Sequence, residues 1–411
     1  MGIELDDVKL SFVEWLYLKD HEVIDILLGA VIANLFQGPD SLNLDLVGPP
    51  SSTKTELLRS LSGYQPIYTI STLTPQTFLS GIKGNRGSLL LNLKSDGKKL
   101  LVLKDLTSIL EMRSESRQEI FGQLRDIADG YTSKTFGTGK RVEWTGKLGI
   151  LAGVTSVIDE HHAHNQILGE RFLYCRVSNN NPEAMAERAR KIAGKEIRMR
   201  DQLQEVMKQF LEQFEEPKIE NIRISEEIEG KLISLACLIA QARTAVSRDR
   251  YHQTVTHLPE TEGPARLVKQ LWILGAGIAT VQGKHEFDEG VYKIIKRIGT
   301  NSLPKHRALI LRTMWESLIM SDKWETTRLI SKLICTPTET VKRYLEDLWM
   351  VGLLNRRIEG EDADDDTWKV RNTPYFWNLS KRCIESIEKS GVFLLYAEDF
   401  LKNDDFAEEV T

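Results

Sequence analysis

Apolar residues in the first part of the chain follow two different spacings. Residues 8–36 carry apolar clusters at helical spacing and end at Gly38-Pro39, which predicts one or two helices. Four short apolar runs have the length of buried strands: residues 44–47, 66–71, 100–105 and 147–153. This alternation predicts an α/β core for residues 1–182.

The rest of the chain is dominated by helical spacing. Residues 182–216 are a long, highly charged helical stretch, and three more helices are expected at residues 224–245, 266–281 and 289–298. We therefore predict a helical domain over residues 183–303. A third domain, residues 304–411, has a different pattern and ends in an acidic tail at residues 403–411.

Residues 304–411 have the element order of a winged helix-turn-helix. Helices are expected at residues 305–320, 325–334 and 338–351, with residues 353–358 and 367–371 as the two strands of a wing. Lys342 and Arg343 on the third helix would meet DNA phosphates, whereas residues 359–366 of the wing loop are acidic. DNA binding and protein docking both stay open for this α+β domain.

The first apolar strand leads directly into a phosphate-binding pattern, Gly-x-x-x-x-x-Lys-Thr. Backbone N–H groups of such a loop bind phosphates, while Lys54 would contact the β and γ phosphates and Thr55 would ligate Mg²⁺. Ser51 and Thr53 stand where glycines are usual. An ordinary strand-turn-helix is the alternative. The predicted nucleotide-binding residues are Gly48, Pro49, Pro50, Ser51, Ser52, Thr53, Lys54 and Thr55.

Asp105 ends the third apolar run. A strand that brings this carboxylate to the same sheet edge as the phosphate loop suits a water-mediated Mg²⁺ contact, so Thr55 and Asp105 are the candidate metal residues. A turn aspartate at a strand end is the alternative.

Two inserted segments interrupt the α/β pattern. Residues 74–87 predict a helix broken by a loop or hairpin, and residues 134–144 predict a glycine-tipped hairpin. Lys134, Lys140 and Arg141 gather near the tip of that hairpin, where they would contact a nucleic-acid backbone. A solvated surface hairpin explains the same residues.

Composition limits the cellular setting. The chain has 411 residues, of which 41% are hydrophobic and 27% charged, and its four cysteines lack any paired metal-ligand spacing. Apolar runs stay below the roughly 20 residues of a membrane helix, so we expect a soluble cytoplasmic protein. A net charge of -5 excludes a globally basic nucleic-acid coat but permits a local basic channel.

The order of these features resembles the AAA+ ATPases of the helix-2-insert and pre-sensor-hairpin branch. The likeness is greatest to the minichromosome-maintenance (MCM)-like helicases of phages and mobile elements. The glycine-poor loop, the hairpin and a strand ending at Thr155 carry this resemblance, which spans about residues 20–380. Arg171, in Gly-Glu-Arg-Phe, resembles the arginine finger of that family, and Arg266 resembles its sensor 2 residue.

This resemblance implies an ATP-dependent DNA helicase or translocase in phage or mobile-element replication. The protein would be a ring-forming homo-oligomer, expected to be a hexamer, that binds single-stranded DNA through its pore hairpins. The implied cofactors are ATP and Mg²⁺, and residues 183–303 would be the lid. The implied catalytic residues are Asp105, Thr155, Arg171 and Arg266.

Other functions stay open because of one departure from the family pattern. Leu106 replaces the acidic residue that polarises the attacking water, and Glu111, one turn later, is the nearest substitute. An ATP-dependent switch, a helicase loader or a protein-remodelling ATPase would tolerate this change. Phe78 and Phe136 in the inserts would suit a polypeptide substrate. A module that holds nucleotide only structurally is a further alternative.

Two other groups of residues have a functional and a structural interpretation. His161, His162 and His164 have zinc-binding chemistry, although a polar loop explains them better. Arg243, Arg248 and Arg250 would line a subunit interface or a solvated face.

Overall fold

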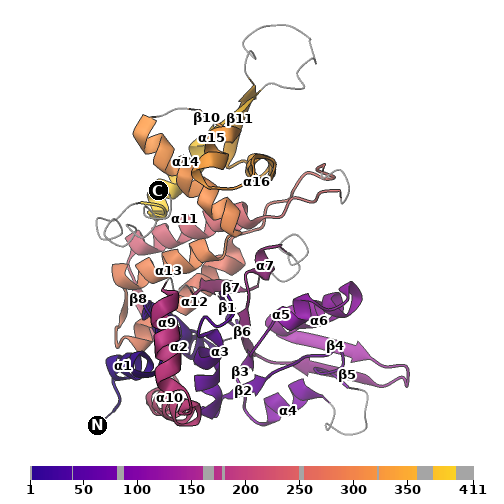
Figure 1. Cartoon of the computed structure of the whole chain (residues 1–411). Helices are drawn as coiled ribbons and strands as arrows, with labels where there is room; N and C mark the ends of the chain where they lie inside the picture. Colours follow the sequence, from indigo (N-terminus) through magenta and orange to yellow (C-terminus); the bar gives the residue numbers. More distant parts are fainter. Residues whose placement is uncertain are drawn as a thin grey trace. The chain divides into compact units, whose positions relative to one another are not determined.

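The computed structural model describes residues 2–38, 40–80, 88–160, 171–177, 181–249, 254–321, 324–358 and 374–394 (Figure 1). The chain divides into two compact units, which are described separately. The first unit contains Met1–Ile228 and Ala265–Ser302, and the second contains Glu229–Pro264 and Leu303–Thr411. The predicted lid, residues 183–303, is shared between the two units.

The first unit is built on a five-stranded parallel sheet. Its strands are β1 Asn43–Val47, β2 Ile67–Ile70, β3 Leu100–Leu103, β6 Gly149–Val154 and β7 Leu173–Arg176. The order across the sheet is β2-β3-β6-β1-β7, and every neighbouring pair is parallel. The predicted α/β class and the four predicted strands are confirmed, whereas β7 is a strand that the apolar pattern did not predict.

The strand order creates a crevice at the carboxyl end of β1. The chain leaves β1 for β2 at one edge, returns through β3 and β6, and then crosses to β7 on the other side of β1. In open parallel sheets, ligands bind where the strand order reverses in this way, outside the carboxyl ends of the strands. The predicted phosphate loop follows β1 directly and therefore lies at this point.

Helices and short strands surround the sheet of the first unit. The amino-terminal apolar stretch forms two helices, α1 Leu5–Trp15 and α2 Glu22–Leu35, and α2 is buried almost all round. The predicted stretch 182–216 is also two helices, because Gly194 adopts φ +82° between them. The other elements of the first unit are α3 Lys54–Arg59, α4 Leu89–Ser95, α5 Thr107–Leu110, α6 Ser114–Ala128, α7 Val157–Glu160, α9 Pro182–Ile192, α10 Glu196–Leu211, α12 Ala265–Val281, α13 Glu289–Asn301, β8 Arg223–Ile224 and β9 Glu286–Phe287.

The predicted hairpin is confirmed as β4 Tyr131–Thr135 paired antiparallel with β5 Arg141–Thr145. Its inner face is apolar, because Val142 and Trp144 are buried in the same cluster as the sheet. The other insert differs from the prediction. Residues 74–80 form turns instead of a helix, and residues 81–87 lie outside the described part of the chain.

The second unit has three helices followed by an antiparallel sheet. The predicted helices are present as α14 Lys305–Ser321, α15 Thr327–Leu333 and α16 Thr338–Met350. The sheet order is β10-β12-β11, formed by Glu325–Thr326, Tyr375–Leu379 and Leu354–Ile358. Helices α11 Glu226–Arg243 and α17 Lys381–Ser390 complete the fold. The expected wing strand 367–371, the acidic loop 359–366 and the acidic tail all lie outside the described residues.

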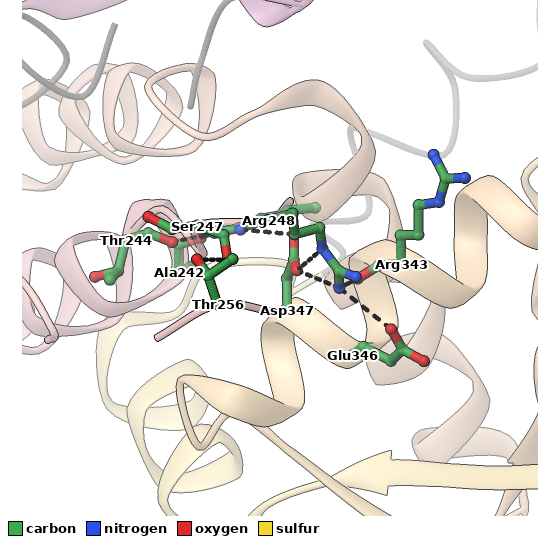
Figure 2. A network of polar contacts seen from close by, with 9 residues as sticks. Ala242, Thr244, Ser247, Arg248, Thr256, Arg343, Glu346 and Asp347 are labelled. Carbon is green, nitrogen blue, oxygen red and sulfur yellow. Dashed lines mark hydrogen bonds and ion pairs between the residues drawn. The ribbon is translucent and has the colours of Figure 1, made fainter. Parts of the chain in front are cut away.

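Asp347 on α16 joins three elements of the second unit. Its carboxylate accepts hydrogen bonds from Arg248 at 2.7 Å and from Arg307 at 3.0 Å, and Arg307 also donates to the carbonyls of Ala242 and Thr244 near the end of α11. Figure 2 shows Arg248 reaching both Asp347 and Glu346. Removing one partner from a buried ion pair typically costs about 3–5 kcal/mol. The network therefore fixes how α11, α14 and α16 meet.

Two of the three arginines predicted at a subunit interface have partners within the second unit. Arg248 belongs to this network, and Arg243 is buried in a pair with Glu262. Arg250 lies outside the described residues. No helix in the described part of the chain has both the length and the apolar character needed to cross a bilayer.

Asp45, in the middle of β1, is a buried carboxyl group in the strand that carries the phosphate loop. It is 2% exposed, its Oδ1 atom has no hydrogen-bond partner among the described residues, and Ala152 and Tyr174 are its neighbours in register. Burial raises the pKa of Asp45 well above its usual range, because a charged carboxylate is poorly solvated there. Burial therefore favours the protonated form more in the folded protein than in the unfolded chain.

We expect Asp45→Asn to stabilise the protein at high pH. The stabilising contribution of this carboxyl is fully present below the unfolded-state pKa of about 4 and is lost as pH rises through the higher folded-state pKa. The variant should gain about 1 kcal/mol or more at pH 8 relative to the parent and less at pH 5, measured by urea unfolding. Asp126→Asn, at a partly exposed aspartate on α6, is the control. Identical pH dependence in parent and Asp45→Asn would contradict this prediction.

Candidate functional site

A cavity of about 520 Å³ opens at the carboxyl ends of β1, β3 and β6. It lies in the first unit, at the crevice that the strand order creates. The sequence-predicted residues that line it are Pro50, Ser51, Ser52, Thr53, Lys54, Thr55, Asp105 and Thr155. Gly48 and Pro49 contribute through their carbonyl groups, which accept hydrogen bonds from Lys54. The structure thus brings the predicted loop, aspartate and threonine together around one space.

The loop has the backbone conformation of glycines although it lacks them at two positions. Ser51 has φ +63° and Thr53 has φ +65°, both in the left-handed region. A β-branched residue rarely adopts this conformation, which costs an L-residue about 1–2 kcal/mol. Ser51 and Thr53 therefore keep the backbone conformation that glycine would adopt, and this conformation stores strain at the site.

Lys54 is held inside the loop. It is 8% exposed, and its Nζ atom donates to the Gly48 carbonyl at 2.5 Å, the Pro49 carbonyl at 2.6 Å and the Ser52 hydroxyl at 2.9 Å. Burial lowers the pKa of Lys54, and the nearby Asp105 carboxylate acts in the opposite direction. The ammonium group therefore lies beside backbone carbonyls and one carboxylate at the phosphate end of the cavity.

Asp105 and Thr155 are joined through a residue that sequence reasoning missed, Thr107. The Asp105 Oδ1 atom accepts from the Thr107 N–H at 2.9 Å, and the Thr107 hydroxyl accepts from the Thr155 N–H at 3.1 Å. The two threonine hydroxyls are 3.4 Å apart. All three residues line the cavity. Asp105 thus makes the local bond of a turn aspartate and also faces the cavity beside Lys54.

The other wall of the cavity is largely apolar and was not predicted. Trp15, Leu16 and Tyr17 line it from the end of α1, and Met185, Ala189 and Ile192 line it from α9. No α9 side chain is buried, so its apolar stripe faces the cavity and not a protein core. The spacing of Met185, Ala189 and Ile192 is helical, and this was a signal available in the sequence.

Basic side chains outnumber carboxylates on the cavity wall. Lys104 and Arg188 line it together with Lys54, and the carboxylates among the described lining residues are Glu56 and Asp105. Glu56 is already engaged, because Arg200 holds it through two hydrogen bonds and Arg59 through a third. The cavity therefore favours a ligand that carries both negative charge and an apolar group.

Neither the position of the missing carboxylate, Leu106, nor its predicted substitute, Glu111, faces the cavity. Leu106 is 1% exposed and packs in the core, so its position points away from the site. Glu111, the predicted substitute, is exposed at the end of α5 and is not among the residues that line the cavity. Asp105 is the one carboxylate of the described lining that no arginine engages.

Both predicted catalytic arginines, Arg171 and Arg266, lie away from this cavity. Arg171 makes a two-point ion pair with Asp129, with distances of 3.0 and 2.8 Å, and its carbonyl accepts from Gln270. Arg266 is exposed in the first turn of α12. Neither lines the cavity, so the site that one chain forms contains Asp105 and Thr155 but not these arginines.

The hairpin charges are partly neutralised by neighbouring carboxylates. Lys134 pairs with Glu119 at 2.9 Å, and Arg141 pairs with Glu143 at 2.5 Å. Lys140 is half-buried near the tip. The two insert aromatics are not exposed, since Phe78 is 1% exposed and Phe136 packs against the core.

In the second unit, the two predicted basic residues of α16 have different surroundings. The Lys342 ammonium lies 5.5 Å from the centre of the Tyr375 ring. The Arg343 side chain is exposed and points away from the Asp347 network (Figure 2). His161, His162 and His164 lie outside the described residues.

Comparison with known proteins adds no relative. No protein-family model matches the chain, and no curated protein matches it.

We expect glycine to be tolerated better than alanine at position 53. Glycine removes the left-handed strain at the cost of unfolded-state entropy, so Thr53→Gly should be more stable than Thr53→Ala by about 1 kcal/mol. Chemical unfolding monitored by circular dichroism measures the difference. Glu205, exposed in α10, is the matched control, because there the alanine variant should be the more stable one. Equal preference for alanine at both positions would show that Thr53 is not strained.

Proposed function

We propose that the protein is an AAA+ ATPase that acts as a DNA helicase or translocase in phage or mobile-element replication. The observation that carries this proposal is the cavity in which the phosphate loop, Lys54, Asp105 and Thr155 meet. Activity would require a ring of identical chains, expected to be a hexamer. The first unit would be the AAA+ core, and residues 304–411 would be a winged-helix domain.

The shape and charge of the cavity support a nucleoside triphosphate as ligand. Loop residues 50–55, Lys54 among them, line the cavity together with the apolar residues Trp15, Met185 and Ile192. A triphosphate needs cationic and N–H donors, whereas a base needs flat apolar contact. The volume of about 520 Å³ is in the range of small-molecule sites. ATP fits this distribution of groups.

The residues present also fit a magnesium ion. Thr55 and Asp105 line the cavity and offer the hard oxygen donors that Mg²⁺ prefers. When bound, magnesium would neutralise charge on the β and γ phosphates. Lys54 would move from the loop carbonyls to the phosphates, and Thr155 would orient the attacking water.

Arg171 and Arg266 would act on a neighbouring chain or on a closed state. Both lie outside the cavity of their own chain, which agrees with a finger that reaches the γ phosphate of the next subunit. Arg171 would have to leave Asp129 for this role. Arg266 would sense the same phosphate from the start of α12.

The sheet order supports the AAA+ assignment. Strand β6, which ends next to Thr155, lies between the phosphate-loop strand β1 and the Asp105 strand β3. Thr155 is thereby placed between the loop and the aspartate, as a sensor of the γ phosphate requires. This order and the hairpin before β6 are what the resemblance to AAA+ ATPases implies.

A slow ATP-dependent switch or remodeller is the second candidate. The buried Leu106 favours it, because no described lining residue replaces the missing catalytic glutamate. Phe78 and Phe136 pack against the core. This packing argues against a polypeptide substrate, because aromatic residues that grip a polypeptide would have to face solvent. DNA therefore remains the proposed substrate.

We expect Lys54→Ala to weaken ATP binding by about 10- to 100-fold, because a charge-assisted contact to phosphate contributes about 1.5–3 kcal/mol. Binding of a fluorescent ATP analogue measures this effect. Lys208→Ala, at a lysine of α10 that does not line the cavity, is the control. In the parent, single-stranded DNA should stimulate ATP turnover. Undiminished ATP affinity in Lys54→Ala would refute the site, and turnover indifferent to DNA would favour the switch.

Thr107→Val should slow ATP hydrolysis about tenfold with little change in KM. The substitution keeps the side-chain shape but removes the acceptor of the Thr155 N–H, and one lost hydrogen bond is worth about 1 kcal/mol. Thr107→Ser, which keeps the hydroxyl, should retain activity. Steady-state kinetics separate kcat from KM. A valine variant as active as the serine variant would show that Thr107 does not position Thr155.

A further inference from the structure

A second, smaller cavity of about 170 Å³ lies at the amino-terminal ends of strands in the same sheet, opposite the first cavity. Four lysines line it: Lys94, Lys98, Lys99 and Lys147. Lys99 directly precedes β3, and Lys147 lies just before β6, so the cavity is at the amino-terminal ends of these strands. Trp144 and Gly146, at the end of the β4–β5 hairpin, form part of the wall.

The lysine charges around this cavity are not balanced by carboxylates. Lys94 donates to the Thr145 carbonyl at 2.6 Å, Lys98 to the Gln65 carbonyl at 2.5 Å, and Lys147 to the Phe36 carbonyl at 2.8 Å. Among the described residues, none of the four lysines forms a salt bridge, and no Asp or Glu lines the cavity. The hairpin cations Lys134 and Arg141, in contrast, are paired with glutamates.

Lys147 shows the cost of this arrangement. Burial and the neighbouring Lys99 lower its pKa to about 8, although Asp40 acts in the opposite direction. The nearest carboxylate partner is itself engaged, because Asp40 pairs with Lys269. An anion in the cavity would relieve the repulsion between Lys99 and Lys147.

We propose that this lysine cavity binds a phosphate group of a nucleic-acid backbone. A single phosphate fits a space of this size, and several lysine ammonium groups supply the point charges that phosphates attract. The position at the base of the hairpin extends the proposed function, because a strand following the hairpin would reach unpaired charges there. The cavity and the ATP site lie at opposite ends of β3 and β6, so they can be tested separately.

Single-stranded DNA binding by the full chain without nucleotide tests this proposal. In Lys99→Gln with Lys147→Gln, the slope of log affinity against log salt should fall by about 0.7, since the cavity holds one phosphate and each phosphate contact on a single strand contributes about 0.7. Lys208→Gln, at an exposed and ion-paired lysine of α10, should leave the slope unchanged. ATP turnover without DNA should be equal in all three proteins, which separates failure here from failure of the ATPase proposal.

Amine acylation read by mass spectrometry gives a measurement that needs no variant. A DNA oligonucleotide should protect Lys99 and Lys147 of the parent protein from acylation and leave Lys208 reactive. Inorganic phosphate at the same phosphate concentration should protect less. Equal protection by inorganic phosphate would identify a free-phosphate site and overturn the nucleic-acid assignment. Unchanged acylation with both ligands, or an unchanged salt slope in the double variant, would overturn the proposal.

Discussion

The backbone of residues 48–53 fixes the position of Lys54 in the cavity. Two residues of this loop, Ser51 and Thr53, adopt positive φ without being glycine, so the loop must be held by its surroundings. The Gly48 N–H donates to Val154 at the end of β6, and the Lys54 ammonium donates to three oxygens of the loop itself. Lys54 therefore acts as an internal template. On the proposed function, this preformed shape would reduce the ordering cost of binding a phosphate.

Strand order extends this constraint to the rest of the site. Because β6 lies between β1 and β3, the ends of β3 and β6 are neighbours, and Leu106 donates its N–H to the Gly153 carbonyl. This contact fixes the turn in which Thr107 bonds to both Asp105 and Thr155. The same turn directs Leu106 into the hydrophobic core. The residue that follows Asp105 therefore contributes to core packing in this chain.

The sequence predicted the parts of the fold that depend on local pattern. Buried strands are continuous apolar runs, and the phosphate loop has a fixed spacing, so β1, β3, β6 and the loop were predictable. Thr107 was not, because its role arises only when β3 and β6 become neighbours. Trp15 and Ile192 line the same cavity although they are far apart in the sequence. Arg171 pairs with Asp129, 42 positions earlier. A local sequence pattern predicts neither of these long-range contacts. Strand β7 is short and ends in Arg176, which made it too weak a pattern to detect.

The two cavities of the first unit are joined by the same strands. Lys99 precedes β3 and Asp105 follows it, while Lys147 precedes β6 and Thr155 follows it. At about 3.3 Å per residue these strands span about 13–20 Å. Strands β3 and β6 are buried and paired on both sides, so on the proposed function a change at the nucleotide end would carry the lysine cavity and the base of the hairpin with these strands. On the proposed function, force on a DNA strand would come from this rigid displacement, and the Asp105–Thr107–Thr155 chain would decide when it occurs.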